Sequence, residues 1–164
     1  MANYYLDTSA LVKCYVVSEV GSAWVQDLIA HRAGNLLLLS QIALVEVAAA
    51  LARKEREGEI TPEERLRYLG LFVWDCRRNR YHLLPNPEAI LRLAADLTYR
   101  RALRAYDAIH LATALQANQL IINAGAAPLT FVSADSRLCV AGLAEGLVVD
   151  NPLDHLSPTA SRGN

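Results

Sequence analysis

The N-terminal stretch joins an apolar run to a carboxylate and then to small hydroxyl residues: Asn3-Tyr4-Tyr5-Leu6-Asp7-Thr8-Ser9-Ala10-Leu11-Val12-Lys13. The run is typical of a buried strand, and Asp7 follows at its carboxyl end. Because ligands of α/β folds bind at the carboxyl ends of the strands, Asp7 is a candidate metal ligand or catalytic group. Asp is also a common N-cap, so Asp7 alone is equally well explained as the cap of the next helix.

The same arrangement occurs near the far end of the chain. The sequence Leu129-Thr130-Phe131-Val132-Ser133 is typical of a second buried strand and is followed by Ala134-Asp135-Ser136. If the two strands are parallel neighbours, Asp7 and Asp135 lie at one edge of the sheet. The repetition favours a functional edge over two unrelated helix caps.

The rest of the chain alternates strand candidates with helical patterns. Strands are predicted at 36–39, 81–84 and 147–149. A short helix is predicted to follow Asp7 and run through Leu11 to Tyr15, and further helices are predicted from 18 or 19 to 34 and at 41–57, 61–78, 87–100, 105–122 and 137–143. Ser40 is a good N-cap for the helix at 41–57, and Thr61 with Glu64 forms a capping box around Pro62. For 121–122 a short strand is the alternative to the helix.

This alternation predicts an α/β fold with a central, mostly parallel sheet. One domain is predicted over residues 1–150, and the polar residues 151–164 are predicted to form a flexible C-terminal tail. The sequence 111–134 lacks charged residues, yet Gln116, Asn118, Gln119, Asn123 and Pro128 interrupt it. A membrane-spanning helix needs about 20 predominantly apolar residues, so a buried helix, a turn and a strand are predicted instead.

Composition limits the function classes. Apolar residues make up 53% of the 164 residues and the net charge is −1. No global basic field therefore indicates nucleic-acid binding, which would need a local patch. The three cysteines, Cys14, Cys76 and Cys139, form neither a disulfide framework nor a zinc pattern, and no signal peptide is visible. A reducing, cytoplasmic setting is predicted.

Two more acids stand within apolar sequence. Glu46 lies near the start of the helix predicted at 41–57, and Asp107 lies in or near the first turn of the helix predicted at 105–122. Helix starts in such folds lie at the same sheet edge as Asp7 and Asp135. Four neighbouring carboxylates need charge compensation, which Mg²⁺ or Mn²⁺ supplies. The alternative is that arginines pair with Glu46 and Asp107 while the other two acids cap helices.

Several residues near these acids in the predicted site each have two possible roles. Thr8, Ser9 and Ser133 either support the acids by hydrogen bonds or serve ordinary turn geometry. His110 either lines the site or is a structural histidine of a mostly apolar helix. Lys13 and the group Arg100, Arg101 and Arg104 are candidates for binding a phosphate backbone. The group Arg77, Arg78 and Arg80 is equally typical of a solvated helix end.

These motifs together resemble the PIN-domain ribonucleases. The resemblance rests on Leu6-Asp7-Thr8-Ser9-Ala10-Leu11-Val12-Lys13, on Glu46 in Leu44-Val45-Glu46-Val47, on Asp107 in Tyr106-Asp107-Ala108-Ile109-His110-Leu111-Ala112, and on Asp135 in Phe131-Val132-Ser133-Ala134-Asp135. It spans about residues 3–149. The chain length and single domain resemble VapC-type toxins of type II toxin–antitoxin systems in particular.

The resemblance implies a three-layer α/β/α domain and Mg²⁺- or Mn²⁺-dependent endonucleolytic cleavage of RNA by a metal-activated water. It implies that the catalytic and metal-binding acids are Asp7, Glu46, Asp107 and Asp135. It also implies a homodimer and a small antitoxin partner. The apolar face of the helix at 61–78, with Leu66, Leu69, Leu71, Phe72 and Trp74, suits either such a partner or ordinary core packing. The alternatives are a metal-dependent phosphatase or DNA nuclease, and a non-catalytic module that binds RNA or protein.

Overall fold

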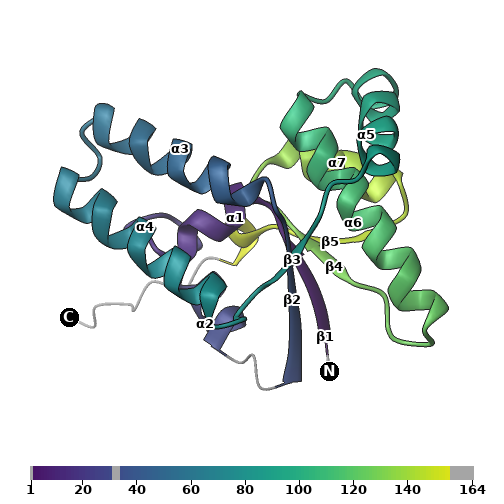
Figure 1. The fold of residues 1–164 in the computed structure, drawn as a ribbon, viewed down its shortest axis with the longest axis horizontal. Helices are drawn as coiled ribbons and strands as arrows, with labels where there is room; N and C mark the ends of the chain where they lie inside the picture. Colours follow the sequence, from purple (N-terminus) through teal and green to yellow (C-terminus); the bar gives the residue numbers. More distant parts are fainter. Residues whose placement is uncertain (1, 31–33, 156–164) are drawn as a thin grey trace, which may run out of the picture.

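The computed structural model describes residues 2–30 and 34–155, and it contains one five-stranded sheet (Figure 1). The strands are β1 (Ala2–Leu6), β2 (Asn35–Ser40), β3 (His82–Leu84), β4 (Thr130–Val132) and β5 (Val148–Asp150). Their order is β3-β2-β1-β4-β5, and each of these neighbouring pairs is parallel. Because β2 and β4 lie on opposite sides of β1, the carboxyl end of β1 is a topological switch point, where such folds form ligand crevices.

Helices connect the strands and cover both faces of the sheet. They are α1 (Thr8–Leu11), α2 (Ser22–Ala30), α3 (Ala43–Arg56), α4 (Pro62–Arg77), α5 (Glu88–Arg100), α6 (Ala105–Asn123) and α7 (Ser136–Ala144), with short 3₁₀ helices at Val12–Cys14 and Pro152–Asp154. Helices α1 to α4 lie on one side and α5 to α7 on the other (Figure 1). The predicted three-layer α/β/α fold is thus confirmed.

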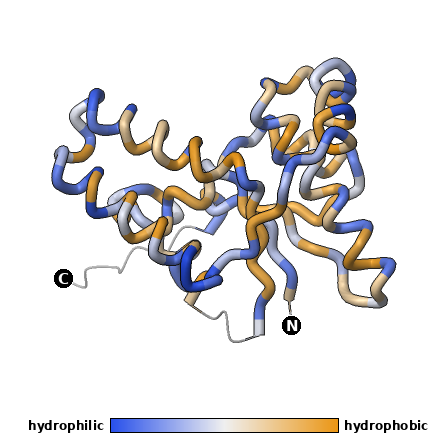
Figure 2. The backbone as a smooth tube through the Cα atoms, in the orientation of Figure 1, coloured by the Kyte–Doolittle hydropathy of each residue, from blue (hydrophilic) through white to orange (hydrophobic). Residues whose placement is uncertain are grey.

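Strand β1 contributes to both halves of the core because its side chains alternate between the two faces of the sheet. Leu6 packs into the cluster under α1 to α4, whereas Tyr5 packs into the cluster under α5 to α7. Both side chains are fully buried. Figure 2 shows the apolar residues gathered on the central strands and the most hydrophilic ones on the outer turns. Continuous apolar strands are typical of a parallel sheet covered on both faces.

Local sequence determines several helix boundaries. Thr61 Oγ1 accepts a hydrogen bond from Glu64 N at 3.1 Å, and Glu64 Oε2 accepts one from Thr61 N at 2.9 Å, which confirms the capping box. Helix α6 continues to Asn123, so the helical reading of 121–122 is confirmed. It is apolar on nearly every side, as expected for a helix buried between the sheet and α5.

Two predicted helix starts were wrong. Ser40 is not the N-cap of α3: it is the last residue of β2, its Oγ accepts from Ile42 N, and the helix begins at Ala43. Helix α2 begins at Ser22, because residues 18–21 form a turn in which Gly21 adopts φ +82°. The short helix predicted after Asp7 is confirmed as α1, and its last part is a 3₁₀ turn. The predicted stop of α2 at Gly34 comes just after residues 31–33, which include His31 and lie outside the described residues.

The first residues of the predicted tail pack against the domain. Pro152 is buried beside Gly21, and the His155 ring stacks on Trp24 with ring centroids 4.2 Å apart. His155 Nε2 also lies 2.6 Å from Asp150 Oδ1. The remainder of that predicted tail, 156–164, lies outside the described residues. Nowhere in 2–30 or 34–155 is a helix long and apolar enough to cross a membrane.

The apolar face predicted on α4 divides into two parts. Phe72 is fully buried in the core, and Leu69 packs against the core at partial exposure. Leu66, Leu71 and Trp74 remain exposed at 61%, 48% and 56%. Core packing thus holds for Phe72 and Leu69, whereas Leu66, Leu71 and Trp74 take no part in the core, and we call this exposed trio the outer α4 patch.

Candidate active site

A cleft of about 660 Å³ opens at the carboxyl edge of the sheet. Asp7 just after β1, helices α1, α3 and α6 and the loop after β4 all contribute to its walls. All four predicted acids line it, namely Asp7, Glu46, Asp107 and Asp135. Thr8, Ser9 and His110 line it as well, so one cleft collects these residues from four separate segments of the sequence.

Asp7 is held at the end of β1 by hydrogen bonds to both carboxylate oxygens. Ser9 Oγ donates to Oδ1 at 2.8 Å and to Oδ2 at 3.0 Å, Ala10 N donates to Oδ1 at 3.0 Å, and Ser133 Oγ donates to Oδ2 at 3.1 Å. The side chain is 4% exposed. Burial raises the pKa of Asp7, and the His110 charge and these hydrogen bonds oppose the rise. Asp7 thus caps α1 and faces the cleft at once.

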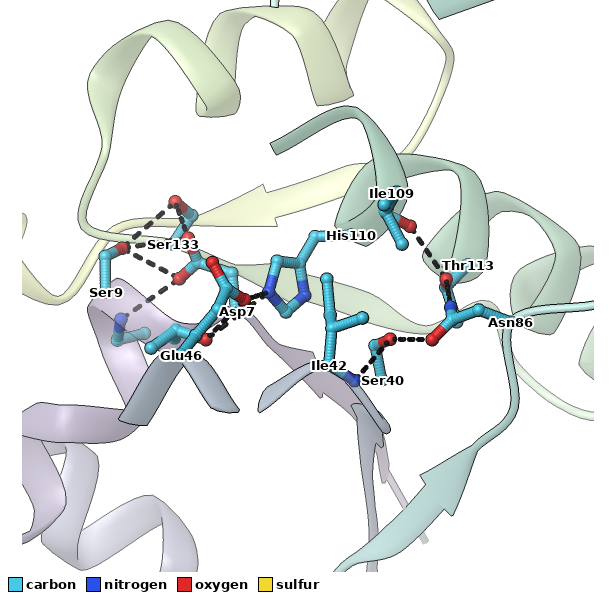
Figure 3. A network of polar contacts seen from close by, with 12 residues as sticks. Asp7, Ser9, Ser40, Ile42, Glu46, Asn86, Ile109, His110, Thr113 and Ser133 are labelled. Atoms are coloured by element: carbon cyan, nitrogen blue, oxygen red, sulfur yellow. Dashed lines mark hydrogen bonds and ion pairs between the residues drawn. The ribbon is translucent and has the colours of Figure 1, made fainter. Parts of the chain in front are cut away.

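The loop after β4 is tied to the loop after β1. Ser133 Oγ, which donates to Asp7, accepts from Asp135 N at 3.1 Å, and Ser9 Oγ accepts from Ala134 N at 2.9 Å. Asp135 caps α7, because its Oδ1 accepts from Arg137 N at 2.8 Å and from Leu138 N at 3.2 Å. No hydrogen bond within the described ranges reaches its Oδ2. The predicted support of the acids by Ser9 and Ser133 matches these contacts (Figure 3).

Glu46 projects from the first turn of α3 and meets two donors. Thr8 Oγ1 donates to its Oε2 at 3.0 Å, and His110 Nε2 forms a very short hydrogen bond to the same oxygen. Its Oε1 accepts no hydrogen bond from the part of the chain that the structure describes. Glu46 is therefore paired with a histidine, and the predicted alternative of an arginine partner is wrong.

Asp107 lies in the first turn of α6, where the helix dipole favours an anion. Within 2–30 and 34–155 its carboxylate forms neither a hydrogen bond nor an ion pair. Partial burial raises its pKa, and the negative charges of Asp135 and Glu46 raise it further, while His110 and Arg104 lower it. The repulsion shows that these acids share an electrostatic environment that lacks full compensation.

The donor set suits a hard divalent cation. Its oxygen donors are carboxylates and hydroxyls, which Mg²⁺ and Mn²⁺ prefer, and no cysteine of the described ranges lines the cleft. No three His, Cys, Asp or Glu side chains in the described ranges are close enough together to hold a metal ion. Mg²⁺ is commonly bound through one or two carboxylates and several waters, so a closed protein cage is not required.

The predicted basic residues separate into two groups. Lys13 and Arg104 line the cleft, although Lys13 is largely buried and forms an ion pair of 2.9 Å with Glu19. Arg100 and Arg101 do not line it, and both bind the Glu145 carboxylate. Several lining residues were not predicted from the sequence: Glu19, Arg53, Lys54, Arg56 and Leu153. The charged run 53–57 was visible, but only the packing of α3 turns part of it toward the acids.

A second polar cluster fixes the start of α6 against the sheet (Figure 3). Asn86 Oδ1 accepts from Ser40 Oγ at 2.8 Å, and Asn86 Nδ2 donates to Thr113 Oγ1 at 2.9 Å. Thr113 Oγ1 in turn donates to the Ile109 carbonyl at 2.7 Å. Asn86 thereby connects β2 and the β3–α5 loop to the helix that carries Asp107 and His110.

Comparison with known proteins shows the family. A family model for the PIN domain matches residues 4–140. Ribonuclease VapC35 of Mycobacterium tuberculosis is 34% identical over 149 residues, which cover 90% of this chain and 96% of that protein.

Solved structures share the fold. VapC20 of Mycobacterium tuberculosis, described as a toxin that cleaves the sarcin–ricin loop, superposes with a TM-score of 0.60 at 14% identity over 88% of this chain and 96% of its own. VapBC2 of Rickettsia felis, solved with a DNA fragment from its promoter, gives a TM-score of 0.58 at 15% identity over 91% of this chain and 98% of its own. With its fold, its four clustered acids and the match over residues 4–140, the chain belongs to the PIN domain family.

Proposed function

We propose that this protein is a metal-dependent endoribonuclease and the toxin of a type II toxin–antitoxin pair. One observation carries the proposal: four acids from β1, α3, α6 and the loop after β4 line a single open cleft. Their order along the chain matches the PIN family, and a relative that is 34% identical is a ribonuclease. The cleft is open to solvent and large enough to admit a nucleotide chain.

Asp107, Asp135 and Glu46 are the residues best able to hold the cation, directly or through bound waters, and we propose that the cation is Mg²⁺ or Mn²⁺. Each presents at least one carboxylate oxygen that forms no hydrogen bond to described residues, and the negative charges of Asp135 and Glu46 already raise the pKa of Asp107. When bound, the ion supplies an acidified water and offsets charge on the phosphate. Asp7 is the central, buried acid, and its four hydrogen bonds fix its orientation in the cleft.

Two arginines at the cleft are available for the RNA backbone. Arg56 from α3 and Arg104 at the start of α6 form no ion pair with any residue in the described ranges, and both line the cleft. Arg104 also lies close enough to Asp107 to lower its pKa. Phosphates bound by these guanidinium groups would pass over the acids. Arg100 and Arg101, held by Glu145, would contribute only after their ion pairs open.

The outer α4 patch is the proposed antitoxin surface. Leu66, Leu71 and Trp74 are large apolar side chains that remain exposed on one helix, which is typical of a protein-binding face. The structure of VapBC2 from Rickettsia felis includes a fold like this one. A homodimer is also proposed, on the resemblance to VapC-type toxins, and light scattering of the purified chain tests it.

The test is RNA cleavage by the purified chain, freed of any partner. Structured RNAs and a matched DNA are incubated with Mg²⁺, Mn²⁺ or EDTA, using wild type and D7N. Cleavage of RNA that needs both the metal and Asp7 is expected, with D7N slower by about 100-fold or more because roughly 3 kcal/mol of transition-state stabilisation is lost. Cleavage by D7N at close to the wild-type rate, or cleavage in EDTA, would refute the assigned site. Preferential cleavage of the DNA would refute the substrate class.

A further inference from the structure

His110 connects the hydrophobic core to the acidic cleft. It lies on α6 and is 1% exposed, yet both of its ring nitrogens have partners. Nδ1 is 2.9 Å from the Tyr5 hydroxyl, and Nε2 bonds to Glu46 Oε2 and lies 3.3 Å from Thr8 Oγ1. Figure 3 shows the ring pointing from α6 toward Glu46. These contacts join β1, α3 and α6 around one imidazole.

The chemistry of the partner fixes the direction of the bond to Glu46. An ionised carboxylate only accepts, so the hydrogen of the His110–Glu46 bond is on Nε2. The Tyr5 hydroxyl can both donate and accept, so it pairs with Nδ1 whether or not that nitrogen carries a hydrogen. Tyr5 is itself fully buried: its ring stacks on Phe131 at 5.6 Å and meets the His110 ring edge-on at 5.9 Å.

The consequence for Glu46 is an asymmetric carboxylate. His110 and Thr8 both act on Oε2, while Oε1 accepts no hydrogen bond within the described ranges. Glu46 has three side-chain torsions and would otherwise sample several rotamers at the cleft wall. Donors on one oxygen remove that freedom and leave the other oxygen for a ligand in the cleft. Partners of this kind commonly orient metal-binding carboxylates.

We propose that His110, held by Tyr5, is the positioning residue for Glu46 and sets the metal affinity of the cleft. The proposal rests on the metal site described under the proposed function. This positioning role requires a hydrogen-bond donor at the position of Nε2, but it does not require that the donor belong to an imidazole ring. A side chain that fills the same space without a donor should therefore fail, whereas a glutamine amide should substitute for the ring.

The experiment measures Mn²⁺ binding to the metal-free full chain by electron paramagnetic resonance, without RNA. H110L should weaken Mn²⁺ binding about 10–100-fold, the range found when such supporting partners are removed. H110Q should stay within about threefold of wild type, because its amide N–H replaces Nε2–H. Y5F, which keeps the ring stacking on Phe131, should lie between them. Urea unfolding of each metal-free variant shows whether the fold is retained.

Two results would overturn the proposal. One is wild-type Mn²⁺ affinity in folded H110L, and the other is equal weakening in H110L and H110Q. If H110L does not fold, the Mn²⁺ affinity of Y5F tests the proposal instead. A wild-type Mn²⁺ affinity in Y5F would then contradict it. E46Q separates this inference from the metal site itself. If E46Q weakens Mn²⁺ binding and H110L does not, only the positioning role is wrong; if E46Q binds Mn²⁺ like wild type, the proposed metal site is wrong and the inference with it.

Discussion

Ser133 Oγ donates a hydrogen bond of 3.1 Å to Asp7 Oδ2 across 126 positions of sequence. The two residues follow neighbouring parallel strands, since β1 and β4 pair directly. One buried hydroxyl thus connects the loop that carries Asp7 to the loop that carries Asp135. The contact makes the geometry of the acidic cleft depend on the pairing of the two strands.

Removing the Ser133 hydroxyl should destabilise the two loops that carry Asp7 and Asp135. In S133A, Asp135 N loses its acceptor and Asp7 loses one donor, so the free energy of unfolding should fall by about 1–2 kcal/mol. The pKa of Asp7 should rise further, because the Ser133 bond lowers it. Urea unfolding and Mn²⁺ binding test this. The matched control is S136A, which alters an exposed serine at the first position of α7; equal effects of the two substitutions would contradict the prediction.

Neutralising Asp107 should stabilise the metal-free protein at neutral pH. Its pKa is raised above that of an ordinary aspartate by burial and by the charges of Asp135 and Glu46. Between the unfolded and the higher folded pKa the native state binds more protons, so stability falls as pH rises through that window and stays low above it. D107N avoids this penalty and should gain on the order of 0.5 kcal/mol near pH 7.

The stability changes with pH in the direction opposite to that expected for an ion-paired acid, whose pKa is lowered in the folded state. Well below the unfolded pKa, Asp107 is protonated in both states, so D107N and wild type should have equal stabilities at about pH 3 apart from other groups. Urea unfolding at the two pH values measures the difference. A D107N variant that is less stable than wild type at neutral pH would show that Asp107 has a structural role.

Asn86 should matter more for stability than its place in a loop suggests. N86A leaves Ser40 Oγ without its acceptor and Thr113 Oγ1 without its donor, and both serve the start of α6. We expect a loss of about 1–3 kcal/mol by urea unfolding, the cost of buried polar groups without partners. Q119A is the control, because Gln119 forms an exposed hydrogen bond to Asn123. If N86A lowers the free energy of unfolding no more than Q119A does, the structural role assigned to Asn86 is wrong.

The two groups of arginines should differ in RNA binding. In a D7N background, which prevents cleavage, R56A and R104A should each weaken RNA binding and lower the salt slope by about 0.7. R100A is the matched control, because Arg100 lies outside the cleft lining and is bound to Asp96 and Glu145. Fluorescence anisotropy at several salt concentrations measures both quantities. A larger effect of R100A than of R104A would instead support the RNA-binding role predicted from sequence for Arg100 and Arg101.

Local patterns in the sequence were sufficient for most of the elements. The buried strands, the capping box of Thr61 and Glu64 and the length of α6 follow from hydrophobic period and capping chemistry within a few residues. The starts of α2 and α3 could not be predicted from these local patterns. Gly21 packs against Pro152, and Ser40 bonds to Asn86, so distant residues decide both.

The sequence by itself determined that acids follow β1 and β4 and that two more acids occupy the first turns of α3 and α6, because strand ends and helix starts meet at one edge of a parallel sheet. Only the tertiary structure decided which groups touch them. His110 reaches Glu46 and Tyr5, Arg104 faces the cleft, and Arg100 turns to Glu145. The reason is physical: a sequence pattern fixes the backbone position of a residue, whereas the packing of helices from opposite faces of the sheet fixes where its side chain points.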